Sequence, residues 1–126
     1  MPNDDGARQS WPERRREERM SGAIPVRIVL DGAERSAMIH DLSATGVLFL
    51  TRARLQPAQS IELRIFLETD DVPTIVRTGR VVRTEKWRDG GGYWPFSAAM
   101  QFDEPLVGHE QRIREINERQ RRLGLT

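Results

Sequence analysis

The sequence predicts a mainly β protein, a small antiparallel barrel with one helix at its C-terminal end. Short segments alternate apolar and polar residues with a period of two, which is the pattern of half-buried strands. Turn signals rich in glycine, aspartate and serine separate these segments. After about residue 104 the apolar spacing changes to a helical period. Close antiparallel strands followed by one helix favour a barrel with the helix on its side or open end.

The strands are expected in order between residues 24 and 102. The first covers 24–30 and continues through the hairpin signal Asp31-Gly32 into a second strand over 35–42. The stretch 43–46 forms the next turn. Further strands are expected over 47–50, 61–67, 74–86 and 98–102, with Gly79 placed as a bulge and 89–92 as a flexible connection.

The C-terminal helix is expected over 105–126. Asp103 is placed to cap its N-terminus, Pro105 suits its first turn and Gly124 suits its end. Its apolar stripe would pack on the barrel or on a partner. The stripe consists of Leu106, Ile113, Ile116 and Leu123.

Length and composition indicate one domain of 126 residues with a modest core. The chain is divided into a flexible N-terminal tail over 1–12, a barrel domain over 13–104 that includes an arginine-bearing arm, and the helix over 105–126. The absence of cysteine excludes disulfides and thiolate metal sites. No apolar segment approaches the roughly 20 residues of a membrane span, and the N-terminus has no signal-peptide core. We therefore expect a cytoplasmic location without membrane insertion.

Two short polar motifs carry the functional signal. The first is an arginine cluster whose planar guanidinium groups can meet phosphate oxygens or the O6/N7 edge of guanine with two donors at once. It consists of Arg14, Arg15, Arg16 and Arg19. Glutamates interleave with these arginines, so a solvated charged helix with internal ion pairs is the alternative interpretation.

The second motif is the stretch 41–46, which contains Asp41, Ser43 and Gly46. The Asp41 carboxylate can accept from the N1–H and N2–H₂ edge of a guanine, and the Ser43 hydroxyl can donate to a phosphate or a ring nitrogen. Gly46 permits a positive φ and a close backbone approach that leaves turn amides free for an anion. An ordinary hairpin turn is the alternative, because these residues are common in turns.

Both motifs in this order resemble the PilZ domain family of bacterial cyclic di-GMP receptors. Arg14, Arg15 and Arg19 match its Arg-Arg-x-x-x-Arg motif, and Asp41, Ser43 and Gly46 match its Asp-x-Ser-x-x-Gly motif. The Pro25-Val26 pair, the stretch 76–83 and the stretch 99–102 are similar to the strands of the family. The resemblance covers roughly residues 12 to 104.

The resemblance implies a six-stranded antiparallel barrel with the arginines on an arm that folds over cyclic di-GMP. Arg14, Arg15 and Arg19 would engage phosphates and guanines, Asp41 and Ser43 would meet a guanine, and Gly46 would shape the turn. It further implies a non-enzymatic adaptor that engages an unidentified downstream protein, without a cofactor other than this ligand.

Other classes of function remain as alternatives. One is a PilZ-like protein–protein interaction module that does not bind the nucleotide. Another is a small nucleic-acid-binding barrel, against which the net charge of +1 argues. A metal site is not expected, since His40 and His109 are far apart and neither belongs to a cluster with ligand spacing.

Overall fold

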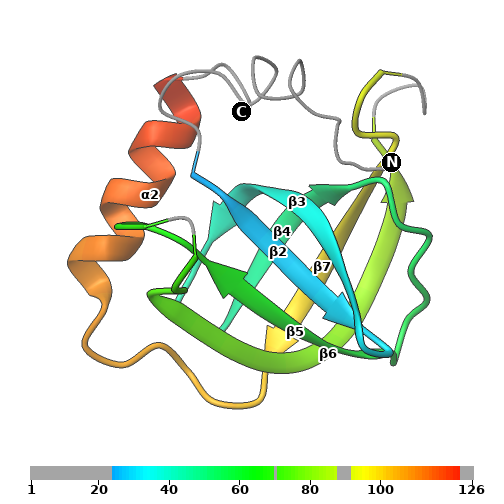
Figure 1. The fold of residues 1–126 in the computed structure, drawn as a ribbon, viewed down its shortest axis with the longest axis horizontal. Helices are drawn as coiled ribbons and strands as arrows, with labels where there is room; N and C mark the ends of the chain where they lie inside the picture. Colours follow the sequence, from blue (N-terminus) through cyan, green and yellow to red (C-terminus); the bar gives the residue numbers. More distant parts are fainter. Residues whose placement is uncertain (1–23, 70, 88–91, 123–126) are drawn as a thin grey trace.

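A computed structural model of the chain describes residues 24–69, 71–87 and 92–122. Six antiparallel strands close into a barrel, and one helix lies against its side (Figure 1). The strand order around the barrel is β2-β3-β4-β7-β6-β5, and β5 pairs with β2 to close it. The elements are β2 (Val26–Leu30), β3 (Ala33–Leu42), β4 (Gly46–Thr51), β5 (Ser60–Ile65), β6 (Ile75–Lys86), β7 (Phe96–Phe102) and α2 (Glu110–Arg122). The six-stranded barrel predicted above is therefore confirmed.

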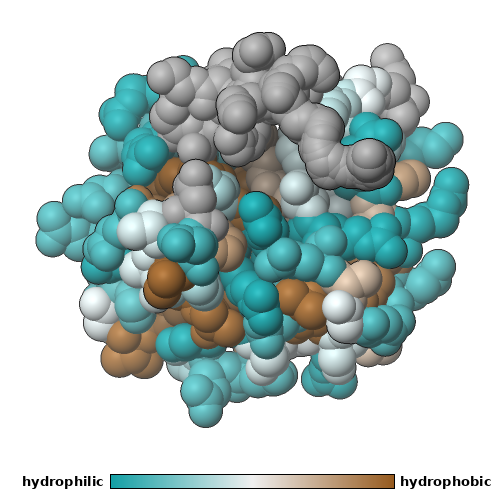
Figure 2. Space-filling view, in the orientation of Figure 1, coloured by the Kyte–Doolittle hydropathy of each residue, from teal (hydrophilic) through white to brown (hydrophobic). Residues whose placement is uncertain are grey.

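Alternation of apolar and polar residues decides which side of each strand faces the core. In β5, Ile61, Leu63 and Ile65 are buried, while Glu62 and Arg64 between them are half-buried on the outer side. Full burial of one such aliphatic side chain contributes about 1.5–3 kcal/mol, so the inward rows of six strands supply the stability of the barrel. The outer face seen in Figure 2 is mostly hydrophilic, with small separate apolar patches.

The hairpin between β2 and β3 follows from its two turn residues. Asp31 has a φ of 52° and Gly32 a φ of 80°, and Leu30 pairs directly with Ala33. Positive φ at both central residues is the type I′ geometry, whose twist matches that of the strands. The predicted turn is confirmed, and the strand after it begins at Ala33 rather than at Arg35.

Gly79 does not form a bulge, contrary to the prediction. It pairs in regular register with Phe102 of β7, and the irregularity of β6 lies between Val81 and Arg83. A Cβ atom at Gly79 would collide with the carbonyl oxygen of Gln101. The glycine is therefore needed for close packing of β6 on β7, which the sequence pattern does not distinguish from a bulge.

The helix begins at Glu110, so the predicted start near Asp103 and Pro105 is wrong. Asp103 continues the contact with β6 instead, because its N–H donates to the Thr78 carbonyl at 2.9 Å and its carboxylate accepts from the Thr78 hydroxyl at 3.0 Å. The first helical turn closes later, with the N–H of Ile113 donating to the carbonyl of His109 at 2.9 Å. Residues 103–109 form a connection between β7 and α2.

Among the described elements, α2 packs on β3. Ile116 and Gln120 are buried, and Ile113 packs on the core while half-buried. Leu106 is buried as predicted, but within the connection rather than on the helix. Leu123 and Gly124, predicted to end the helix, lie outside the described residues.

Candidate functional site

The motif 41–46 forms the end of β3 and the turn into β4, so Asp41, Ser43 and Gly46 come together as predicted. The turn is closed by Ser43, whose N–H donates to the Gly46 carbonyl at 2.9 Å. Its hydroxyl oxygen accepts from the N–H groups of Thr45 at 3.3 Å and Gly46 at 3.2 Å, and the hydroxyl donates to the Gly46 carbonyl at 3.2 Å. The hydroxyl thus stabilises the turn, which agrees with the conformational alternative for this residue.

Asp41 is exposed beside this turn, on the outer face of β3. Its carboxylate makes no hydrogen bond or ion pair with any residue that the structure describes. The register of β3 on β4 shifts between Ile39 and Asp41, so His40 is an extra residue. A bulge of this kind redirects the side chains that follow it. Asp41 consequently faces outward opposite Leu48, and its acceptor oxygens have no partner within the described part of the chain.

The role predicted for Gly46 changes. Its φ is not positive, so conformational freedom is not the reason for a glycine here. A Cβ atom at Gly46 would collide with the carbonyl oxygen of Met100 on β7. The close approach that the glycine permits is thus between β4 and β7, directly beside the motif turn.

The outer surface next to Asp41 can be derived from the strand register. Asp41 lies opposite Leu48 of β4, which pairs with Ala99 of β7, which pairs with Arg83 of β6. We call these four residues the outer strip. At about 4.8 Å per strand, Asp41 and Arg83 stand roughly 14 Å apart along the sheet. The outer strip is charged at both ends and carries only apolar side chains between them.

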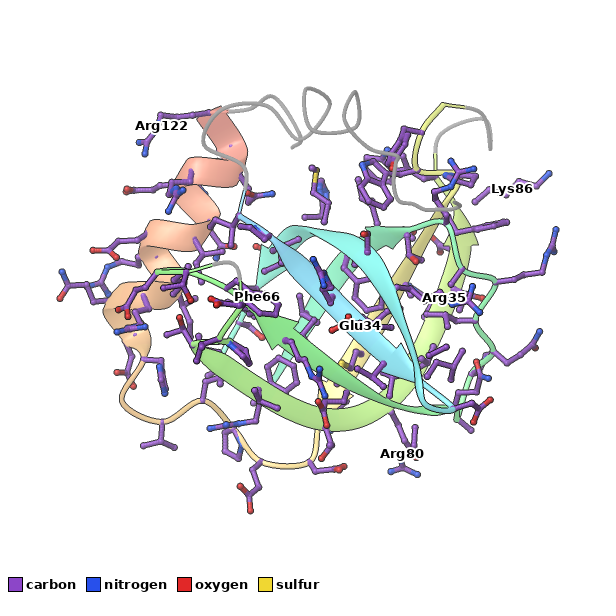
Figure 3. All side chains as sticks on the ribbon, in the orientation of Figure 1. Glu34, Arg35, Phe66, Arg80, Lys86 and Arg122 are labelled. Carbon is purple, nitrogen blue, oxygen red and sulfur yellow. The ribbon has the colours of Figure 1, made fainter. Side chains whose placement is uncertain are left out.

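A second row lies next to the outer strip. Gly46 pairs with Gln101, and Gln101 pairs with Arg80, which is exposed and points away from the barrel (Figure 3). Arg83 lies 3.7 Å from Glu85, and both side chains are more than half exposed. Arg80, Arg83 and Gln101 were not predicted as surface neighbours of the motif. Alternation along the predicted strands places Arg80 and Gln101 outward, but Arg83 requires the register, because β6 shifts by one residue between Val81 and Arg83.

The arginine motif cannot be placed next to these residues. Arg14, Arg15 and Arg19, with Arg16 beside them, lie outside the described residues. The described part of the site therefore consists of the motif turn and the outer strip.

His40 and Trp87 form an aromatic contact behind Asp41. Their ring centroids are 5.0 Å apart in an edge-to-face arrangement with an interplanar angle of 65°. The His40 Nδ1 atom is buried and has no hydrogen-bond partner among the described residues. No group of three or more metal-ligating side chains occurs in the described part of the chain. At the bulge the imidazole ring packs edge-to-face against Trp87.

An ion-pair cluster on β2, β3 and β5 lies apart from the motif. Glu34 accepts from Arg27 at 3.1 Å and from Arg64 at 3.2 Å. The Arg64 Nε donates to Glu62 at 2.5 Å, and this hydrogen bond raises the pKa of the Arg64 guanidinium. These arginines are occupied by carboxylates, so they are poor candidates for binding an anion.

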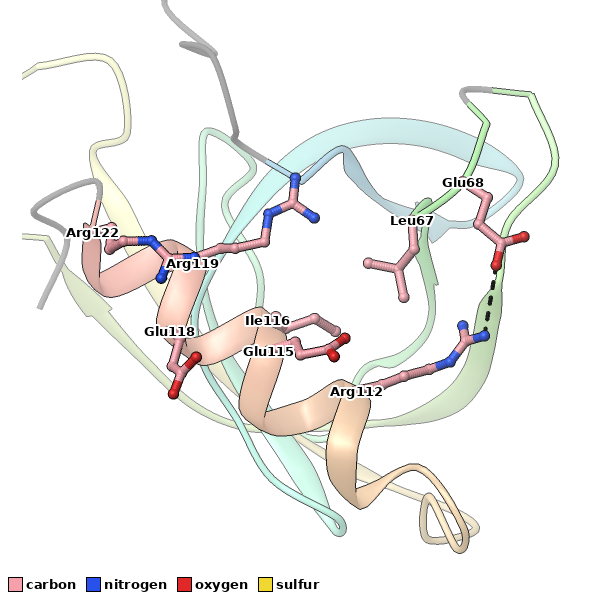
Figure 4. Close-up of a pocket in the computed structure, with 8 residues that line it drawn as sticks. All are labelled: Leu67, Glu68, Arg112, Glu115, Ile116, Glu118, Arg119 and Arg122. Carbon is pink, nitrogen blue, oxygen red and sulfur yellow. Dashed lines mark ion pairs between the residues drawn. The ribbon is translucent and has the colours of Figure 1, made fainter.

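Two grooves lined by described residues lie elsewhere on the surface. One, of about 360 Å³, runs between α2 and the residues after β5, where Arg112 lies 3.6 Å from Glu68 (Figure 4). The other, of about 300 Å³, is lined by residues of β4, β6 and β7 and the loop after β4. Neither is lined by a residue of the motif turn.

Among the described residues, no helix is long and apolar enough to cross a membrane. Among solved structures, the chain is similar to the Bacillus subtilis inhibitor of motility MotI/DgrA, with a TM-score of 0.56 and 19% sequence identity. This similarity covers 81% of the chain and 48% of that protein, so the chain spans about half of its length. At this identity the similarity concerns the fold.

No curated protein sequence matches the chain. The family model of the PilZ domain matches residues 13–119, a range that contains the arginine motif, the whole barrel and most of α2. Fold, motif turn and family match agree, and the chain belongs to the PilZ domain family.

Proposed function

We propose that this chain is a receptor for cyclic di-GMP and passes the signal to a downstream protein as an adaptor. The observation that carries the proposal is the Asp41 carboxylate. It is exposed on the outer face of a PilZ barrel and has no partner among the described residues. A free pair of acceptor oxygens beside an apolar strip suits the N1–H and N2–H₂ donors of a guanine base.

The motif residues have different roles in binding cyclic di-GMP. Arg15 and Arg19 clamp the ligand and Arg14 assists them, through bidentate contacts worth about 1–3 kcal/mol each. Asp41 selects guanine. Ser43 and Gly46 act on the shape of the surface, because the hydroxyl closes the turn and the glycine lets β4 approach β7.

The outer strip extends this surface away from the turn. Leu48 and Ala99 offer small or apolar contact area to a guanine ring bound at Asp41. Arg83, at the other end, is more than half exposed, and its 3.7 Å contact with Glu85 is longer than the ion pairs of the cluster on β2, β3 and β5. It supplies a cation for a phosphate of the same ligand, which would take the place of Glu85. Three or four such contacts reach the roughly 8 kcal/mol of a micromolar complex, after subtraction of the cost of ordering groups on binding.

Ligand binding then fixes the arginine-bearing N-terminal arm across the barrel and changes the surface offered to a downstream protein. The switch is a shift of population between two states, driven by the higher affinity of the ligand for the ordered state. PilZ domains act as binding and adaptor modules, which is consistent with this non-catalytic role.

Isothermal titration with cyclic di-GMP, with GTP as the competing nucleotide, tests the proposal. We expect micromolar or tighter binding that Asp41→Ala and Arg15→Ala each weaken at least tenfold. Asp71→Ala and Arg35→Ala are matched controls, because Asp71 and Arg35 are exposed and lie outside both motifs. Unchanged affinity in both motif variants would rule out the assigned site. No heat with the wild-type protein would leave a PilZ domain that works through protein contacts alone.

A further inference from the structure

The backbone between Asp41 and Ser43 is held by one side chain of the C-terminal helix. The N–H of Leu42 donates to Asn117 Oδ1 at 2.9 Å, and Asn117 Nδ2 donates to the carbonyl of Leu42 at 2.8 Å. The side-chain amide of Asn117 thus pairs with both the N–H and the carbonyl of Leu42, as the backbone of a neighbouring strand would do. Any rotation of the backbone at Leu42 breaks both hydrogen bonds, so α2 fixes the orientation of the residues on either side.

A second amide of α2 holds the same strand at its bulge. Gln120 is fully buried, and its Nε2 donates to the carbonyl of Ile39 at 2.7 Å. Pairing of β3 with β2 ends at Ala37, and beyond it the glutamine amide supplies a partner for the Ile39 carbonyl. Its Oε1 is buried without a partner among the described residues. A buried amide with one unsatisfied atom is costly, so packing alone does not explain a glutamine at this position.

The end of β7 and the connection that follows it contact the turn as well. The N–H of Leu106 donates to the Ala44 carbonyl at 2.8 Å, and the N–H of Phe102 donates to the Thr45 carbonyl at 2.9 Å. Within the described residues, β3 is the only strand or helix on which α2 packs. The motif and the C-terminal segment therefore share one continuous hydrogen-bonded network.

We infer that α2 is coupled to the ligand site, with Asn117 as the positioning residue that transmits the coupling. Asn117 fixes the backbone of Leu42 and thereby orients Asp41 beside it. A ligand bound to Asp41 in turn restrains the strand to which Asn117 is hydrogen-bonded. This inference rests on the proposed function for the identity of the ligand. Coupling between two sites is reciprocal. If the contact of Asn117 with β3 raises the affinity for the ligand, ligand binding stabilises the packing of α2 on β3 by the same free energy.

The test compares three variants of the full chain on α2. Asn117→Ala removes both hydrogen bonds to Leu42. Gln111→Ala removes an amide from the exposed side of the same helix, where it contacts Glu115. Ile113→Ala removes a half-buried side chain that packs on the core from the same helix, so it lowers stability without removing either hydrogen bond to Leu42.

We expect Asn117→Ala to raise the Kd for cyclic di-GMP about tenfold, within the usual range of coupling between two sites. Both control variants should stay within about twofold of the wild-type protein. The Ile113→Ala control separates a positioning role from a general loss of stability. A wild-type Kd in Asn117→Ala, in a protein whose binding is lost in Asp41→Ala, would overturn the inference and leave the proposed function intact.

Amide hydrogen exchange of the ligand-free protein gives an independent readout. We expect the amides of residues 43–46 to exchange at least tenfold faster in Asn117→Ala than in Gln111→Ala. If the wild-type protein does not bind cyclic di-GMP, the proposed function fails and this readout decides the inference. Faster exchange confined to the turn would support the positioning role of Asn117, and equal rates in the two variants would overturn it.

Discussion

Replacing Gly46 tests why the motif contains a glycine. A Cβ atom at this position would collide with the Met100 carbonyl oxygen, while the next nearest atoms lie at 3.5 Å and 3.6 Å. One backbone oxygen therefore causes the whole clash. It cannot turn aside, because Met100 belongs to the β4–β7 ladder. Separation of the two strands by about 1 Å would be needed, and overpacking of this kind costs about 1–3 kcal/mol.

Gly32 provides the contrast, because its φ is 80° and a Cβ atom there would meet nothing within 4 Å. Alanine at Gly32 pays only the strain of a left-handed backbone, about 1–2 kcal/mol. Asparagine tolerates that conformation better than alanine does. Gly32→Asn should therefore be more stable than Gly32→Ala. At Gly46 asparagine should be no better than alanine, since both carry the clashing Cβ.

Urea unfolding of the four variants, followed by circular dichroism, measures these differences at a common slope. We expect Gly46→Ala to lose about 1–3 kcal/mol of unfolding free energy, and Gly46→Asn at least as much. Recovery of stability in Gly46→Asn would refute the steric explanation and restore the conformational one. A loss below about 0.5 kcal/mol in Gly46→Ala would show that β4 and β7 separate freely.

Two further predictions concern the helix. Ile116→Ala should lower the unfolding free energy by about 2–5 kcal/mol in the same assay, because Ile116 is only 1% exposed between α2 and the barrel; an exposed-site control, Glu118→Ala, should leave it almost unchanged. Gln120→Glu should make stability depend on pH, because burial raises the pKa of the new carboxyl above its value in the unfolded chain, about 4.3. The protonated carboxyl can still donate to the Ile39 carbonyl, so the loss of unfolding free energy relative to wild type should be small near pH 4.5. Above that pH the loss should grow by up to about 1.4 kcal/mol per pH unit. A loss that is constant between pH 4.5 and 8 would contradict a buried carboxyl.

The strands could be predicted because each alternates cleanly and ends at a turn signal. Asp31-Gly32 is the clearest case, since few other pairs accept a positive φ at both positions. The start of the helix could not be predicted from the residues around it. Leu106 fits the helical stripe, yet its burial in the connection satisfies the same apolar pattern. The bulge at His40 did leave a signal, because Ile39 and Leu42 are both apolar with two polar residues between them.

The candidate site was predictable only in part. Asp41, Ser43 and Gly46 could be grouped from sequence because they belong to one turn. Asn117 and Gln120 could not be assigned to the site from sequence. A polar side chain on a helix looks the same in the sequence whether it binds the backbone of a strand or faces water. Their role depends on contacts across more than 70 residues of sequence. Arg83 needed a strand register, which depends in turn on the bulge that shifts β6 by one residue.

The closure of the barrel limits how a downstream protein can approach. Because β5 pairs with β2 and β7 is inserted between β4 and β6, each of the six strands has a hydrogen-bonded neighbour on both sides. Pairing with β2 ends at Ala37 of β3, where α2 binds the backbone instead, and pairing with β5 ends at Arg80 of β6. An incoming peptide therefore finds only short strand ends on which to add a strand. Recognition must instead use side chains, and these differ far more between related barrels than backbone amides do. The side chains on the outer face are therefore what would distinguish this chain from another closed barrel of the same fold.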